Sequence, residues 1–191
     1  MKIAVLLLSF AVASAATLTA SASDPKKATP HDYELADGIV VLLDVPDGWT
    51  GGVADKANQR VPSILFASAA DPRFQVLVSV APLTDAQQVE GGVKRDADRF
   101  APQSVEGKAP LRSLRAAPGQ GWYFKVTDKQ YADPRSVVPA GEFKYLAQGA
   151  VIKGPMTLLF SFLTNDDSRE VEAAALKMIR KAGVRQDGGS T

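Results

Sequence analysis

Two segments of this chain have apolar side chains on both sides of an expected β-strand, and this pattern restricts the possible folds more than any other feature. Successive residues of a strand point to opposite sides. One side of these segments carries Phe74, Val76, Val78, Val80, Met156, Leu158, Phe160 and Phe162, and the other carries Leu77, Ala81, Leu159 and Leu163. Such strands belong inside a sheet that is covered on both faces. We expect two helices to pack against the two faces of the sheet, one on each, and to leave a filled core.

A helix is expected at 84–100, which lies in the sequence between the expected strands 74–81 and 156–164. Thr84 and Gln87 form a capping box at its start. Its apolar stripe, spaced three or four residues apart, consists of Ala86, Val89, Val93, Ala97 and Phe100. Gly91 and Gly92 interrupt the pattern, and each costs about 1 kcal/mol relative to alanine. We interpret this glycine pair as a close-packing point or a kink.

The last regular segment of the sequence, at 168–182, predicts a second helix. Asp167 caps it, and Glu170 completes a capping box three residues later. Acidic residues lie near its start and basic residues near its end, as the helix dipole favours. Gly183 suits the C′ position that follows a helix, with Val184 closing against the last turn.

The remaining segments are expected to form antiparallel hairpins. Asp37-Gly38 is the strongest short hairpin signal, and Gly154-Pro155 indicates a tight connection between the last two strands. The expected strands are 32–36, 39–45, 61–69, 74–81, 111–116, 121–128, 142–152 and 156–164. This order predicts an α+β fold with a mainly antiparallel sheet and a helix on each face of it. Such an arrangement is a three-layer α/β/α sandwich.

The ends of the chain differ from this regular pattern. Lys2, the apolar run that follows it and Ala20-Ser21-Ala22 are typical of a secretory signal peptide. No segment approaches the roughly 20 apolar residues of a membrane-spanning helix. The expected parts are a signal peptide at 1–22, a flexible lead at 23–30, a single α+β domain at 31–185 and a polar tail at 186–191. The expected compartment is the periplasm or, alternatively, the medium.

Composition argues against several classes of function. The 22 Lys and Arg residues nearly balance the 21 Asp and Glu residues, so no basic excess favours nucleic acid as a partner. A zinc site lacks ligands, because the chain has no cysteine and a single histidine, His31, which we interpret as a surface residue. No serine-hydrolase or nucleotide-binding motif is present. We expect no catalytic residue, metal or cofactor, although paired carboxylates for glycoside cleavage stay open because the fold sets their separation.

The chain resembles the PsbP-like fold superfamily, which is named after an extrinsic photosystem subunit and includes small exported bacterial proteins. The resemblance covers a hairpin that ends in 43–49 (LDVPDGW), the middle helix, and late strands that run through 164–167 (TNDD) into the C-terminal helix. Members of this superfamily are mostly non-enzymatic accessory proteins that bind other proteins, some with metals or small ligands. The resemblance therefore implies a binding or assembly role and no active site.

Two surface features are candidates for recognition. The loop 129–141 is long for a strand connection, and its Tyr131, Asp133 and Arg135 are the partner-binding residues we predict; the alternative is a solvated connector. A basic cluster of Lys108, Arg112 and Arg115 could hold an anionic group or form a solvated edge.

The first functional hypothesis is a non-catalytic exported accessory protein that binds another protein or an envelope component. Two alternatives stay open at this point. One is a periplasmic immunity protein that neutralises a delivered toxin, and the other is a small-ligand carrier or an unrecognised hydrolase. The oligomeric state is left open by the sequence.

Overall fold

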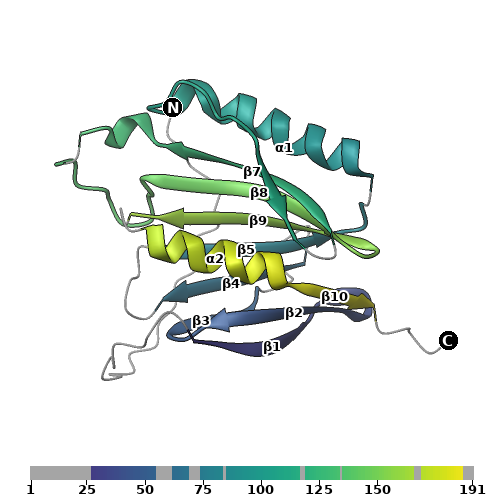
Figure 1. The fold of residues 1–191 in the computed structure, drawn as a ribbon. Coiled ribbons are helices and arrows are strands. Elements are labelled where there is room, and N and C mark those ends of the chain that lie inside the picture. Colours follow the sequence, from purple (N-terminus) through teal and green to yellow (C-terminus); the bar gives the residue numbers. More distant parts are fainter. Residues whose placement is uncertain are drawn as a thin grey trace.

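The computed structural model describes residues 27–54, 62–68, 74–83, 85–116, 119–133, 135–165 and 169–186. The predicted signal peptide, the first part of the predicted lead, the expected caps Thr84 and Asp167, and the tail after Gln186 lie outside the described residues. The described elements are β1 (Ala28–Glu34), β2 (Ile39–Pro46), β3 (Trp49–Val53), β4 (Ser63–Ser68), β5 (Phe74–Ala81), α1 (Ala86–Phe100), β6 (Arg112–Arg115), β7 (Gln120–Thr127), β8 (Tyr145–Lys153), β9 (Met156–Thr164), α2 (Arg169–Lys181) and β10 (Gly183–Gln186) (Figure 1).

Within the described residues the strands form two sheets. The large sheet has the order β3-β4-β5-β9-β8-β7-β6, and the small sheet has the order β1-β2-β10. Every pairing in both sheets is antiparallel. The predicted α+β class with a mainly antiparallel sheet is confirmed.

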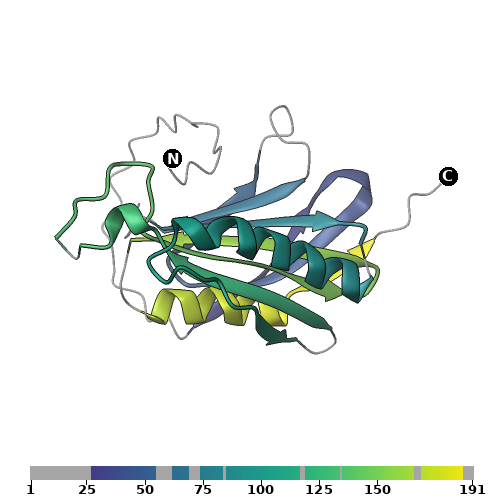
Figure 2. The same cartoon turned by 90° about the horizontal axis from the view of Figure 1, so that it is seen from above.

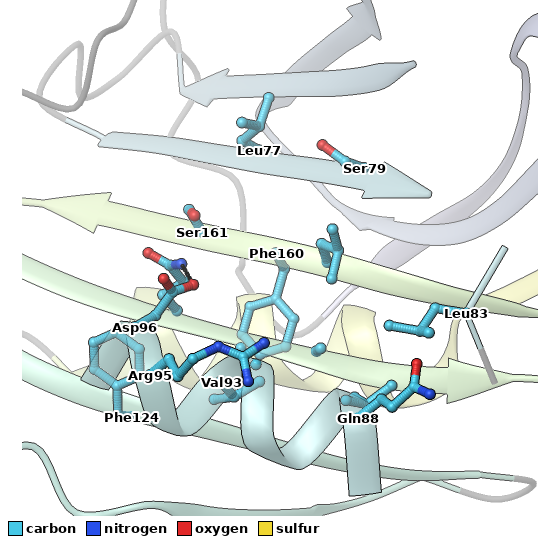
Figure 3. Close-up of a pocket in the computed structure, with 16 residues that line it drawn as sticks. Leu77, Ser79, Leu83, Gln88, Val93, Arg95, Asp96, Phe124, Phe160 and Ser161 are labelled. Atoms are coloured by element: carbon cyan, nitrogen blue, oxygen red, sulfur yellow. Dashed lines mark hydrogen bonds between the residues drawn. The ribbon is translucent and has the colours of Figure 1, made fainter. Parts of the chain in front are cut away.

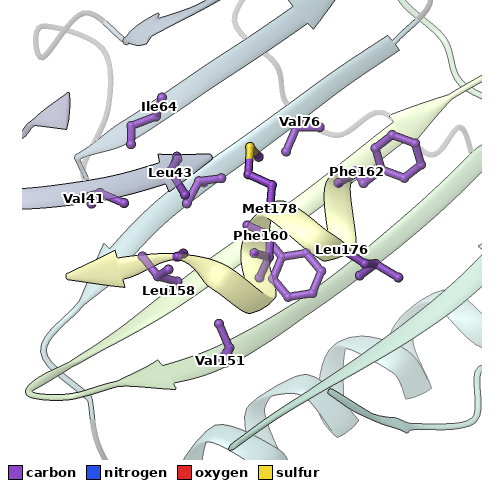
Figure 4. Packing of buried hydrophobic residues seen from close by; sticks show 14 of the residues in the cluster. Val41, Leu43, Ile64, Val76, Val151, Leu158, Phe160, Phe162, Leu176 and Met178 are labelled. Carbon is purple, nitrogen blue, oxygen red and sulfur yellow. The ribbon is translucent and has the colours of Figure 1, made fainter. Parts of the chain in front are cut away.

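The large sheet carries helices on opposite faces, as the sequence predicted (Figure 2). On one face, α1 packs against β7 and β8. On the other face lie α2 and the small sheet, whose strand β2 contacts α2. Figure 4 shows this second interface, where Leu43 of β2 and Met178 of α2 lie among side chains from the large sheet.

The small sheet was not expected, and it corrects the prediction at both ends of the domain. β1 begins at Ala28, inside the predicted flexible lead at 23–30. Gly183 is not a left-handed C′ residue; it begins β10, in which Val184 pairs with Val41. Pairing of residues 28–31 and of β10 with β2 satisfies backbone groups that local sequence patterns left unassigned.

Several local predictions are confirmed by the structure. β1 and β2 form the hairpin expected around Asp37-Gly38, and β4 pairs with β5 as the second hairpin. The chain passes from the small sheet to the large one at Asp47-Gly48, where Gly48 has a φ of 82°. The start of α1 differs from the prediction, because Asp85 is the N-cap and its carboxylate accepts a hydrogen bond from the Gln88 N–H at 2.7 Å.

One buried charge links α2 to the large sheet. Lys153 of β8 is 4% exposed, and its Nζ donates a 2.7 Å hydrogen bond to the carbonyl oxygen of Arg180 in the last turn of α2. Burial lowers the pKa of this amine, because desolvation disfavours the ammonium form. A cation at this position also complements the carboxyl end of the helix dipole.

Candidate functional site

The best-supported candidate site is a groove beside α1, on the face of the large sheet that this helix only partly covers. A helix is about 10 Å wide with its side chains and strands lie about 4.8 Å apart, so one helix covers about two strands. α1 packs on β7 and β8, and the same face of β9 and β5 extends beyond it. The prediction that the two helices leave a filled core is therefore wrong for the part of this face formed by β9 and β5.

The groove has an apolar floor with small hydroxyl groups set into it. Leu77 and Ser79 of β5 and Ser161 of β9 form this floor, and α1 forms the wall (Figure 3). Leu159 of β9, which pairs with Ser79, also lines the groove. Leu159 is 38% exposed although it lies within a central strand of the large sheet. The hollow has a volume of about 320 Å³. We call it the α1 groove.

The wall of the α1 groove supplies the polar groups. Gln148 reaches from β8 and donates a 2.8 Å hydrogen bond from its Nε2 to Oδ2 of Asp96, whose other oxygen meets Arg99 at 3.0 Å. Arg95 and Gln88 line the groove from exposed positions of α1. For Arg95, the described part of the chain holds no ion-pair partner.

Gly92 explains part of the width of the groove. The pair Gly91-Gly92 was interpreted as a close-packing point or a kink, but α1 continues without interruption from Ala86 to Phe100. A methyl group added at Gly92 would meet only the Arg95 guanidinium, at 3.9 Å. Gly92 therefore lines the groove and leaves space there. The glycine pair in an otherwise amphipathic helix was the feature of the sequence that could have indicated the α1 groove.

The chemistry available in the α1 groove favours binding over catalysis. A serine nucleophile needs a base within hydrogen-bonding reach. The lining of the groove holds one carboxylate, Asp96, which is already engaged by Gln148 and Arg99, and no histidine. Ser79 Oγ lies 2.7 Å from Ser63 Oγ, in a hydroxyl pair that includes no base.

The structure separates the three predicted partner-binding residues. Tyr131 is 4% exposed and donates a short hydrogen bond from its hydroxyl group to Oε2 of Glu142. Burial, together with this bond to a carboxylate, raises the pKa of Tyr131 to about 12. Asp133 and Arg135 are exposed and contact each other, with the Arg135 N–H 2.8 Å from Asp133 Oδ1. A contact through this loop would therefore use Asp133 and Arg135, because the ring of Tyr131 lies inside.

Neither a group of metal ligands nor a membrane-spanning helix is found in the described parts of the chain. No three His, Asp or Glu side chains there come together in a group that could hold a metal ion. In the same residues, neither α1 nor α2 has the length and apolar character needed to cross a bilayer. His31 is an exposed residue of β1 whose ring lies 6.2 Å from that of Tyr33.

The segment 104–111, which follows α1, is held to β7 by a 2.9 Å hydrogen bond from the Val105 N–H to the Thr127 carbonyl oxygen and by the carboxylate of Glu106. Oε1 of Glu106 accepts a hydrogen bond from the Thr127 hydroxyl group at 2.7 Å, and Oε2 accepts one from the Thr127 N–H at 3.1 Å. Burial acts to raise the pKa of Glu106, but these hydrogen bonds outweigh it and the pKa is lowered. The ionised carboxylate is thus the form that the fold favours.

We predict that Glu106→Gln destabilises the protein at neutral pH and not in acid. The pKa of Glu106 is lower in the folded state than its ordinary value of 4.5, so the charged carboxylate stabilises the fold at pH values above 4.5. This contribution is lost as the pH falls through the folded-state pKa. We expect a loss of about 0.5–1 kcal/mol at pH near 7 for this solvent-screened group. Urea unfolding at neutral pH and in acid, below the folded-state pKa of Glu106, measures this loss of stability. Glu90→Gln, which removes an exposed charge of α1, is the control, and an equal loss from Glu106→Gln at both pH values would contradict the assignment.

Comparison with known proteins yields neighbours among solved structures. The cyanobacterial PsbP (CyanoP) from Synechocystis sp. PCC 6803 is 12% identical with a TM-score of 0.47, over 91% of this chain and 99% of that chain. A crystal structure from Bacteroides thetaiotaomicron is 13% identical with a TM-score of 0.46, over 79% of this chain and 47% of that chain. The first carries the name of the PsbP-like superfamily that the sequence resembles. The likeness concerns the fold alone. No protein-family model and no curated protein matches the chain.

Proposed function

We propose that this protein is a non-catalytic, exported accessory protein that binds another protein through the α1 groove. The observation that carries the proposal is the uncovered half of a sheet face, where Leu77, Leu159 and Leu65 are only partly buried. Apolar side chains gathered on an exposed surface and rimmed by polar groups are typical of interaction sites. The export of the protein rests on the signal peptide predicted at 1–22.

The shape of the α1 groove favours a polypeptide over a small molecule. Its volume of about 320 Å³ lies at the lower end of the range of about 300–1,000 Å³ that is usual for small-molecule sites. Its floor is a sheet face that continues sideways onto β4, through Leu65 and Ala67. An apolar side chain of the partner would fill the groove between Leu77 and Leu159, while Arg95 and Gln88 on the rim would meet polar groups of the same partner.

A photo-crosslinking amino acid at position 159 will identify the partner in extracts of the native cell envelope, and the purified pair will then be titrated. We expect Leu159→Glu to weaken binding at least tenfold, about 1.4 kcal/mol, because it places a charge in the apolar floor. Val137→Glu is the matched control, since Val137 is 89% exposed and lies in the loop after β7, outside the groove. Equal affinities of Leu159→Glu and the wild type would refute the proposal.

A further inference from the structure

A second hollow lies on the opposite face of the large sheet from the α1 groove. It has a volume of about 500 Å³ and is bounded by β7, β8, β9, the first turn of α2 and the segment 106–112. Its apolar lining includes Phe162 and Ala147 of the sheet, with Tyr145 beside them. We call it the α2-side cavity.

Charged side chains line the α2-side cavity on several sides. Lys108, Arg112 and Lys125 face it together with Glu106 and Glu172, which leaves one positive charge in excess. Both carboxylates are engaged within the chain. Glu172 forms a 2.5 Å ion pair with Lys125, in which the two side chains are 19% and 30% exposed, and Glu106 accepts both hydrogen bonds from Thr127.

Lys108 and Arg112 differ from these groups, because neither has a hydrogen-bond or ion-pair partner among the residues described. Both are exposed at the edge of the cavity, where a ligand could reach them. A guanidinium group presents a fork of N–H donors that matches a carboxylate or a phosphate, and a lysine adds a compact second charge. Both cations line the same cavity and neither is engaged within the described residues, so they are the groups there that could hold an anion.

The structure also divides the basic cluster that the sequence suggested. Arg112 pairs with Tyr123 across β6 and β7, and it shares its side of the strand with the fully buried Leu114. Arg115 lies on the other side of β6, because successive residues of a strand alternate. Only Lys108 and Arg112 of the three basic residues line the α2-side cavity.

We propose that the α2-side cavity binds a small organic anion, with its carboxylate or phosphate group on Lys108 and Arg112 and its apolar body against the half-buried Tyr145. The cavity is larger than an inorganic anion requires, and this body would occupy the remaining space. This site is separate from the proposed protein-binding groove. If one of the two proposed binding sites is refuted, the other can still be tested.

The test is isothermal titration calorimetry of the protein without residues 1–22, the predicted signal peptide, at constant ionic strength. Benzoate is the carboxylate probe, phenyl phosphate is the phosphate probe, and inorganic phosphate shows what the apolar body adds. We expect saturable binding of benzoate or phenyl phosphate, tighter than that of inorganic phosphate. Arg112→Ala and Lys108→Ala are each expected to weaken it at least tenfold.

Arg115→Ala is the matched control, because it removes the same charge from the same strand on the opposite side. We expect its affinity to stay within twofold of the wild type. The absence of saturable binding of both organic probes would overturn the proposal. It would be overturned equally if Arg115→Ala weakened binding as much as Arg112→Ala, since the effect would then come from overall charge.

Discussion

Replacing Phe66 with alanine is expected to cost about 4 kcal/mol of folding free energy, a large share of the roughly 5–15 kcal/mol that stabilises a domain of this size. Phe66 lies on β4, is fully buried, and packs edge-on against Tyr33 of β1, with ring centroids 5.5 Å apart. The ring therefore joins the large sheet to the small one. Its removal leaves a cavity between two sheets, each made rigid by its own strand pairing, so the site collapses only in part to fill it.

Urea unfolding followed by circular dichroism measures this loss, and Leu65→Ala is the matched control. Leu65 is the neighbour of Phe66 on β4 and points to the other face of the large sheet, where it is only partly buried. We expect it to cost about 1 kcal/mol, because little apolar area returns to water. Equal losses from the two variants would mean that the groove face of β4 is covered, and this would also remove the basis of the proposed function.

Gly149→Ala is expected to cost about 3 kcal/mol or more, at the upper end of overpacking effects. Gly149 lies within β8, a central strand of the large sheet. An added methyl carbon would fall against the carbonyl oxygen of Trp122, 2.5 Å from Tyr123 Cβ and 2.8 Å from the Phe160 ring. The first of these atoms is backbone in a paired strand, so relief requires a shift of β7 against β8.

The control for Gly149→Ala is Gly52→Ala, in the edge strand β3. Nothing lies within 4 Å of a methyl group added at Gly52, and its backbone is not left-handed. We expect Gly52→Ala to leave stability unchanged or to raise it by up to about 1 kcal/mol, because alanine restricts the unfolded chain. Thermal unfolding of both variants provides the comparison. A loss below about 1 kcal/mol for Gly149→Ala would contradict the close approach of β7 and β8.

The contrast between Leu158 and Leu159 shows how far the sequence predicted the candidate site. Both leucines alternate along an apolar strand, and the sequence assigned both to packed faces. Leu158 is fully buried between the large sheet and the elements on the α2 side, whereas Leu159 is 38% exposed in the α1 groove. Alternation gives the side of a strand on which a residue lies, but it does not show what covers that side.

The sequence by itself determined the local elements of this protein. The Asp37-Gly38 and Gly154-Pro155 turns, the strand alternation and the two helix stripes each depend on residues close together in the chain, so their patterns can be read directly. They were sufficient for the α+β class and for a helix on each face of the large sheet.

Only the tertiary structure decided which surfaces stay open. The pairing of β10 with β2 joins segments from opposite ends of the domain, and no local pattern encodes such a pairing. α1 lies over β7 and β8, which leaves Leu77 and Leu159 at the surface. The physical reason is geometric: the large sheet is wider than one helix, and the position of that helix depends on packing between residues distant in sequence.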